Sequence, residues 1–294
     1  MLGAACLLTL TVGAAGPSFA PLRPSLDEIQ VATSTLGRVS VLPRRPAAAF
    51  AELHRRAPEL RPVVLERALV AAYAARRVGF GRHRPFLVVI DHSLPSDARR
   101  LWVFNLRTRR LVRRERVAHG EGSGEDRPLY WSNGVDSRAS SLGLFVTRET
   151  YRGRRGHSLR LIGLDPGHND RAYRRSLVFH GAGYMTETFR NTHGGVFGQS
   201  HGCPALDPAV SREVIDLLEG GTLVFVHGPD PRWLRESSWL QGRVPAGLRA
   251  WPGPRAPRVS QAPQVNRAPA QEGGAAHTTA NLDQSELPTT LPGT

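Results

Sequence analysis

The sequence predicts a mainly β fold, a sandwich or barrel-like core with a few peripheral helices and disordered termini. From Pro85 onward, apolar and polar residues alternate with a period of two, which is typical of half-buried strands. Helical periodicity is clear in two segments, which begin at Pro62 and Asp207. Both ends of the chain lack these patterns and are rich in proline and small residues. These observations favour a single β-rich domain between two tails.

Residues 1–20 have the features of a signal peptide. Leu2–Ala15 carries no charge, and Ser18-Phe19-Ala20 places small residues where a signal peptidase reads them. The usual basic start is missing, so a short uncleaved apolar segment is the alternative, although it is shorter than the ~20 residues that span a bilayer. Either interpretation predicts an exported protein, periplasmic or otherwise in the cell envelope. Residues 21–57 are expected to be a linker.

The first helix is predicted to begin at Pro62, because proline suits the first helical turn and because Leu65, Leu69 and Tyr73 then share one face. We expect it to lie on the outside of the core. Seven strands are predicted from their patterns, with a polar turn at 107–110 between the second and the third. Their ranges are Phe86–Asp91, Arg100–Leu106, Leu111–Ala118, Leu144–Thr147, Ser158–Ile162, Leu177–His180 and Thr222–His227.

The second helix is predicted to begin after Asp207, which serves as the N-cap, with Pro208 in the first turn and an end at the glycine pair 220–221. We therefore assign residues 58–251 to one domain whose core is 84–227. Residues 253–294 contain no aromatic residue and six prolines, so they cannot bury enough apolar surface to fold. Residues 252–294 are accordingly predicted to be a disordered tail.

The charge of the chain is strongly positive. All 39 basic residues are arginine, and the formal net charge is +14 at pH 7. Such a charge favours association with anionic surfaces, and we expect cell-wall polymers or membranes as the partners. Nucleic acid is not expected, because the arginines are spread along the chain and are not interleaved with aromatic residues on one stripe.

Cys203 and His180 are the candidate catalytic pair. Cys203 is the one cysteine that remains if the segment containing Cys6 is removed on export. A thiolate is the attacking form of cysteine, and a nearby imidazole can generate it. His180 ends a short apolar run that is predicted to be a strand, which would hold the ring on a rigid element. The sequence therefore predicts a cysteine nucleophile with His180 as its base.

The glycines around Cys203 allow tight turns in which backbone N–H groups converge. The amides of His201, Gly202 and Cys203 are our candidates for an oxyanion hole. Ser200 is expected to orient the loop or the substrate. No cofactor and no metal ion are expected.

Two other sites are compatible with the same residues. Gly198-Gln199-Ser200-His201-Gly202 fits the G-x-S-x-G pattern of serine hydrolases, which would make Ser200 the nucleophile, although the required strand and helix are not predicted around it. A zinc site is the second alternative, because histidine and cysteine are common zinc ligands, but no close pair has the usual spacing. Its ligands would come from His180, His193, His201 and Cys203.

Several motifs, in order, resemble those of the YkuD-like L,D-transpeptidases, and most closely the branch called the murein L,D-transpeptidase catalytic domain family. The two that carry the chemistry are His180-Gly181 and Ser200-His201-Gly202-Cys203-Pro204-Ala205-Leu206. The resemblance extends from about Arg84 to about His227. The other matching blocks are Val117–Gly120, Ser123–Asp126, Ser140–Gly143, Tyr151–Gly153, Ser158–Leu161 and Gly163–Gly167.

The resemblance implies a YkuD-like β fold and a transferase that cross-links peptidoglycan stem peptides through a Cys203 thioester. It also implies that the Gly181 carbonyl fixes the tautomer of His180. Tyr184, Ser141 and Gly143 are candidates for the donor groove, together with Ser200. Water as the acceptor would give an L,D-carboxypeptidase, and a wall-binding module without catalysis is a further alternative. The oligomeric state and the type of cross-link stay undetermined.

Overall fold

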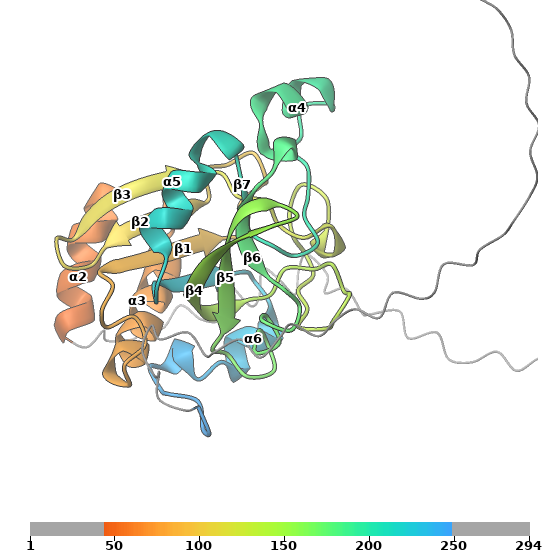
Figure 1. Cartoon of the computed structure of the whole chain (residues 1–294). Coiled ribbons are helices and arrows are strands. Elements are labelled where there is room, and N and C mark those ends of the chain that lie inside the picture. The colour runs from red at the N-terminus through yellow and green to blue at the C-terminus, as the bar shows by residue number, and fades with distance from the viewer. Residues whose placement is uncertain (1–43, 249–294) are drawn as a thin grey trace, which may run out of the picture. The chain divides into compact units, whose positions relative to one another are not determined.

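The computed structural model describes residues 44–248, and its centre is one mixed sheet of eight strands in the order β3-β2-β1-β8-β4-β5-β6-β7. In Figure 1, β1 to β3 run nearly across the direction of β4 to β6, so the sheet curves strongly and approaches a barrel. The mainly β prediction is confirmed. The strands are β1 Phe86–Asp91, β2 Leu101–Asn105, β3 Arg110–Glu115, β4 Gly143–Gly153, β5 Gly156–Gly163, β6 Val178–Gly181, β7 Ala205–Leu206 and β8 Leu223–His227.

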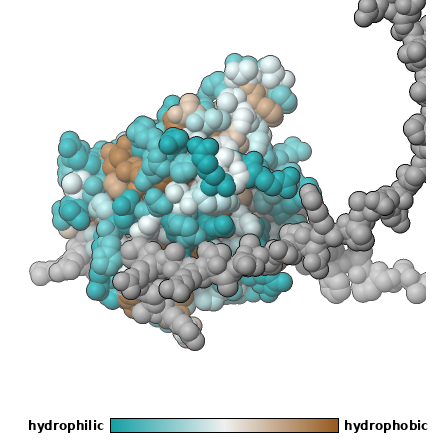
Figure 2. Space-filling model, in the orientation of Figure 1, coloured by the Kyte–Doolittle hydropathy of each residue, from teal (hydrophilic) through white to brown (hydrophobic). Residues whose placement is uncertain are grey.

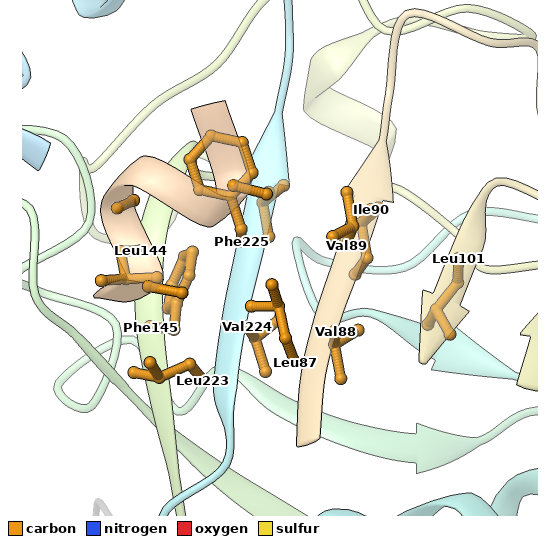
Figure 3. Close-up of a cluster of buried hydrophobic side chains, with 14 of the residues drawn as sticks. Leu87, Val88, Val89, Ile90, Leu101, Leu144, Phe145, Leu223, Val224 and Phe225 are labelled. Atoms are coloured by element: carbon orange, nitrogen blue, oxygen red, sulfur yellow. The ribbon is translucent and has the colours of Figure 1, made fainter. Parts of the chain in front are cut away.

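Two parallel pairs interrupt an otherwise antiparallel sheet. β1 pairs in parallel with β8, and β6 pairs in parallel with β7 at one edge of the sheet. The middle strands are buried on both faces, since every residue of β8 and all but the first of β1 are buried. Figure 3 shows how apolar side chains from β1, β4 and β8 meet in this core, among them Val89, Phe145 and Phe225.

The helices are α2 Arg44–Arg56, α3 Pro62–Arg77, α4 Glu187–Thr192, α5 Pro208–Leu218 and α6 Pro231–Glu236. α5 begins as predicted, with the Asp207 side chain accepting a hydrogen bond of 2.8 Å from the amide of Ala209. It connects β7 to β8 and packs mainly on β6. This packing matters for the candidate catalytic pair because β6 carries His180.

The helix at Pro62 is not peripheral, which corrects the sequence prediction. α3 contacts α2, β1, β8 and the short turn at Trp239–Gln241. Its small residues allow this close approach on a second face, in addition to the face that carries Leu65 and Leu69. The buried residues of α3 are Val64, Leu65, Ala68, Leu69, Ala71, Ala72, Ala74 and Ala75.

The expected linker at 21–57 is wrong over its last part. α2 occupies 44–56, and the side chains of Ala49, Leu53 and Ala57 are fully buried in the core. Composition did not reveal this apolar face, because Leu53 is surrounded by alanines and arginines. The rest of the linker and the segments 1–20 and 252–294 lie outside the described residues.

The surface facing the viewer in Figure 2 is mostly hydrophilic, with few hydrophobic residues. The large apolar side chains that are exposed in the described part of the chain are Val112, Leu129, Val135, Tyr173 and Val196. Within residues 44–248, no helix combines the length and the apolar character needed to cross a membrane.

Candidate active site

Pairing of β6 and β7 brings the two candidate catalytic residues to one edge of the sheet. His180 lies opposite Ser158 of β5 on one side and opposite Ala205 of β7 on the other. Cys203 precedes Ala205 by two residues, so the loop that carries it runs into a strand paired with the strand of His180. Residues 199–204 are called the nucleophile loop below.

The thiol of Cys203 lies beside the start of β6. Its sulfur donates to the carbonyl oxygen of Ser176 across 3.8 Å. Burial raises the pKa of the Cys203 thiol, while the Val178 amide and the nearby charges of Arg155 and Arg175 act in the opposite direction. Cys203 is 8% exposed, so the sulfur is close to the surface but shielded from bulk water.

His180 is held in one tautomer. Because a carbonyl can only accept, the 2.9 Å contact from Nδ1 to the Gly181 oxygen requires the proton to be on Nδ1. Nε2 therefore carries the lone pair, and it is buried with no hydrogen-bond partner among the described residues. Burial lowers the pKa of His180, so the ring is neutral near pH 7 and can act as a base.

Gly181 also fixes the distance between β6 and α5. A Cβ atom at this position would lie 2.6 Å from the hydroxyl oxygen of Ser211. A larger residue would push the strand that carries His180 away from α5. Gly181 therefore contributes both its carbonyl and its lack of a side chain.

Ser200 organises the nucleophile loop. It is buried, and its hydroxyl donates to the carbonyl of Cys203 at 2.6 Å and accepts from the amide of Gly202 at 3.0 Å. The backbone of Ser200 is fixed by the amide of Ser200 and the carbonyl of His119, 2.9 Å apart. Of the two roles expected for Ser200, these contacts favour orientation of the loop.

Gly202 adopts a backbone conformation that glycine tolerates best, with φ of 104°. A Cβ atom there would lie 2.6 Å from the carbonyl oxygen of Ala139. Since the Gly202 amide already donates to Ser200, it is not available to an oxyanion in this conformation. The amides of His201 and Cys203 remain as the predicted donors of the oxyanion hole.

The predicted groove residues Tyr184, Ser141 and Gly143 differ in their surroundings. Tyr184 is half-buried, and its hydroxyl has no hydrogen-bond partner in the described part of the chain. Burial raises the pKa of Tyr184 to about 12, and the charge of an ionised Cys203 contributes in the same direction. Ser141 is buried and donates to the Ser132 carbonyl. A Cβ atom on Gly143 would lie 2.5 Å from a carboxylate oxygen of Asp165. Packing thus accounts for Ser141 and Gly143, whereas Tyr184 stays a groove candidate.

The alternative sites do not assemble. Ser200 is followed by β7 and not by a helix, contrary to the requirement of a nucleophile elbow. His193 stacks on Phe189 with ring centroids 3.7 Å apart, and His201 is exposed near Glu121. Within residues 44–248 no group of three potential ligands is placed to hold a metal ion.

One charged residue near the thiol was missed by the sequence analysis. Arg175 precedes β6, and its guanidinium reaches back to a loop more than 30 residues earlier, with a contact of 2.7 Å to the carbonyl of Ala139. A Cβ atom on Gly202 would lie 3.1 Å from its Nη2 atom. No local pattern signals this position, because the contacts are made through the fold.

Comparison with known proteins gives one family and a set of solved structures. The model of the L,D-transpeptidase catalytic domain matches residues 56–227, more than half of the chain. No curated protein matches the chain. Among solved structures, an L,D-transpeptidase from Mycobacterium smegmatis is 16% identical with a TM-score of 0.31, and the match covers 49% of this chain and 59% of that one. L,D-transpeptidase 3 from Mycobacterium tuberculosis, in complex with a faropenem-derived adduct, is 14% identical with a TM-score of 0.30 over 49% and 60% of the two chains.

The matched part spans about three fifths of these solved chains. The similarity that identifies the protein is the family match, whose range contains β1 to β8, His180 and the nucleophile loop. On that match, the chain belongs to the L,D-transpeptidase catalytic domain family.

Proposed function

We propose that this protein is a peptidoglycan L,D-transpeptidase that uses Cys203 as nucleophile and His180 as general base. The observation that carries the proposal is the lone pair of His180 Nε2, fixed by the Gly181 contact, on a strand that begins two residues after Ser176, whose carbonyl contacts the Cys203 sulfur. The family supports the same substrate class. The substrate is the stem peptide of peptidoglycan.

The resting pair is neutral. The pKa of the thiol is raised and the pKa of the imidazole is lowered, so proton transfer from sulfur to Nε2 is unfavourable before substrate arrives. Transfer is therefore expected to accompany attack on the substrate, as in general-base catalysis. The imidazolium formed in this step is stabilised by its Nδ1–H bond to the Gly181 carbonyl.

The reaction proceeds in two halves. Nε2 takes the thiol proton while the sulfur bonds to the carbonyl carbon of the third stem residue, and the amides of His201 and Cys203 receive the charge that develops on the oxygen. The C–N bond to the terminal D-residue then breaks, and the proton on Nε2 passes to the departing amine. A thioester on Cys203 remains.

The second half regenerates the enzyme. An amine of another stem attacks the thioester, its proton returns through His180 to the sulfur, and a new amide forms the cross-link. If water attacks instead, the product is a carboxylate and the enzyme is an L,D-carboxypeptidase. Both outcomes use the same residues, so only the acceptor distinguishes them.

The test uses the purified protein with a disaccharide-tetrapeptide, with and without an added acceptor amine. We expect the terminal D-residue to be released and a dimer or amine adduct to form, as followed by mass spectrometry. Cys203→Ala should abolish release and His180→Gln should reduce it strongly, whereas a chelator should have no effect. Release of the D-residue by Cys203→Ala at the wild-type rate would contradict the proposal, and binding of wall polymer without turnover would indicate a binding module.

We also propose that the protein is exported to the periplasm or cell envelope and meets anionic wall or membrane surfaces there. The formal charge of +14 and the apolar residues 1–20 support this proposal. Fractionation of cells that produce the full chain tests it. Recovery of the protein with the cytosol, at its unprocessed mass, would contradict it.

A further inference from the structure

The guanidinium of Arg175 has all four of its terminal N–H groups engaged by neutral acceptors. Nη1 donates to the Ser132 carbonyl at 2.7 Å and to the Ser141 hydroxyl at 2.6 Å. Nη2 donates to the Ser137 hydroxyl at 3.1 Å and to the Ala139 carbonyl at 2.7 Å. These bonds fix the position of the group but neutralise none of its charge.

Arg175 also has no anionic partner at ion-pair distance in the described part of the chain. Asp136 is the carboxylate whose field reaches it, and Asp136 is exposed. Burial lowers the pKa of Arg175, yet a guanidinium stays protonated near neutral pH. A half-buried cation without a counter-ion is costly to fold around, because its loss of hydration is not balanced by a nearby negative charge.

The uncompensated charge lies next to the nucleophile loop. Nη2 would be 3.1 Å from a Cβ on Gly202, the residue that precedes Cys203. Ser176, which follows Arg175 in the chain, supplies the carbonyl that contacts the sulfur. The field of Arg175 therefore acts on Cys203, and a negative sulfur is the charge that would compensate it.

We propose that Arg175 is a positioning residue whose fixed positive charge stabilises the anionic sulfur of Cys203, and that it does so through its field and not by binding substrate. The inference rests on the proposed role of Cys203 as nucleophile. Its terminal N–H groups are already used, so a substrate carboxylate has no free fork on this side chain to bind. The four bonds hold the charge in place while the sulfur loses its proton during attack.

Other groups also face the sulfur, and their effects on the pKa of Cys203 must be distinguished from the effect of Arg175. Arg155 lies in the turn between β4 and β5, is exposed, and lowers the pKa of Cys203 at least as strongly as Arg175 does. His180 and Tyr184 are neutral near pH 7, since burial lowers the pKa of the first and raises that of the second. An exposed charge is screened at high salt, where the Debye length is about 3 Å in 1 M salt, whereas a fixed, half-buried charge is screened less.

The test measures alkylation of Cys203 by the neutral reagent iodoacetamide and the anionic reagent iodoacetate, across pH, with the modified cysteine identified by peptide mass spectrometry. In Arg175→Gln we expect the iodoacetamide profile to move to higher pH by about one unit, a roughly tenfold loss of rate below the thiol pKa. The ratio of iodoacetate to iodoacetamide rates should fall several-fold. Arg175→Lys should restore most of this ratio, and the exposed Arg174→Gln should leave both quantities unchanged.

The ratio separates a charge effect from a structural one. If Arg175 only ties loops together, both reagents change in proportion and the pH midpoint stays in place, which would overturn the proposal. The effect of Arg155→Gln should disappear in 1 M salt, while that of Arg175→Gln should persist. If Arg175→Gln does not fold, the test uses the Arg155→Gln protein in 1 M salt. A ratio of iodoacetate to iodoacetamide rates above that of a free cysteine peptide supports the proposal, and an equal ratio contradicts it.

These readouts do not depend on turnover. If Cys203→Ala keeps its activity on the tetrapeptide, the proposed function fails whatever the alkylation shows. If Cys203→Ala is inactive but the ratio does not respond to Arg175, only the inference about Arg175 fails.

Discussion

Replacement of Ser200 by alanine distinguishes the two candidate nucleophiles and has a cost that follows from the structure. The hydroxyl bonds to the Cys203 carbonyl and the Gly202 amide, with a longer contact of 3.2 Å to the His119 carbonyl, and Ser200 is 2% exposed. Its loss leaves a buried carbonyl and a buried amide without partners, at about 1–3 kcal/mol for each group. We expect Ser200→Ala to lower the free energy of unfolding by about 2–4 kcal/mol, since water can reach part of the loop.

The activity of Ser200→Ala should be reduced but present. The sulfur and the imidazole remain, and only the order of the nucleophile loop is weakened, so we expect roughly 1–10% of the wild-type rate, because misplacement of a nucleophile by about 1 Å costs on the order of a hundredfold. The assays are urea denaturation and release of the terminal D-residue. Ser96→Ala is the matched control, because it also removes a buried hydroxyl, which donates to Asp126 at 2.9 Å in another loop. Complete loss of turnover in Ser200→Ala with unchanged stability would mean that the hydroxyl does not order the loop, and would favour a serine nucleophile.

Three further predictions concern the nucleophile loop, the helix α2 and the buried histidines. Gly202→Ala should destabilise the domain and abolish turnover, because its Cβ would lie 2.6 Å from the Ala139 carbonyl oxygen at φ of 104°; a stable and active variant, seen by thermal melting and turnover, would contradict this. Leu53→Ala should cost about 2–4 kcal/mol in urea denaturation because the side chain is fully buried in α2, and a change near zero would mean that 44–56 is a linker after all. The free energy of unfolding should fall as the pH decreases from about 7 to 4. Burial lowers the pKa of His119 to about 4 and the pKa of His227 to about 3, so the unfolded chain binds protons at a higher pH than the folded protein does, and each group contributes up to about 1.4 kcal/mol per pH unit. Midpoints of urea denaturation that do not change over this pH range would be inconsistent with neutral buried histidines.

Local patterns predicted most of the sheet but not its edges. The apolar runs at Phe86–Asp91 and Thr222–His227 located β1 and β8 within a residue. The third strand was predicted to reach Ala118 but ends at Glu115, since β3 is an edge strand with only one neighbour to pair with. α2 was missed because its burial depends on packing against α3, and local sequence patterns do not show which helices pack together.

The sequence motifs identified the candidate catalytic residues but not the contacts that surround them. The thiol of Cys203 and an imidazole at the end of a predicted strand suggested the pair, and the structure adds the contact of the sulfur with the Ser176 carbonyl. That contact arises because β7 pairs with β6, and the periodicity of a sequence does not show which strands pair. Arg175 is the extreme case, because the hydrogen bonds that fix it join residues 34–43 positions apart.

In the proposed reaction, the sulfur of Cys203 carries the acyl group of the substrate. Peptide mass spectrometry of the protein, quenched in acid during turnover of the disaccharide-tetrapeptide, detects this group. We expect a thioester-linked disaccharide-tripeptide on the peptide that contains Cys203, and its absence in Cys203→Ala. An acyl group found on Ser200, or turnover that persists with no acyl group on Cys203 in any quenched sample, would contradict it.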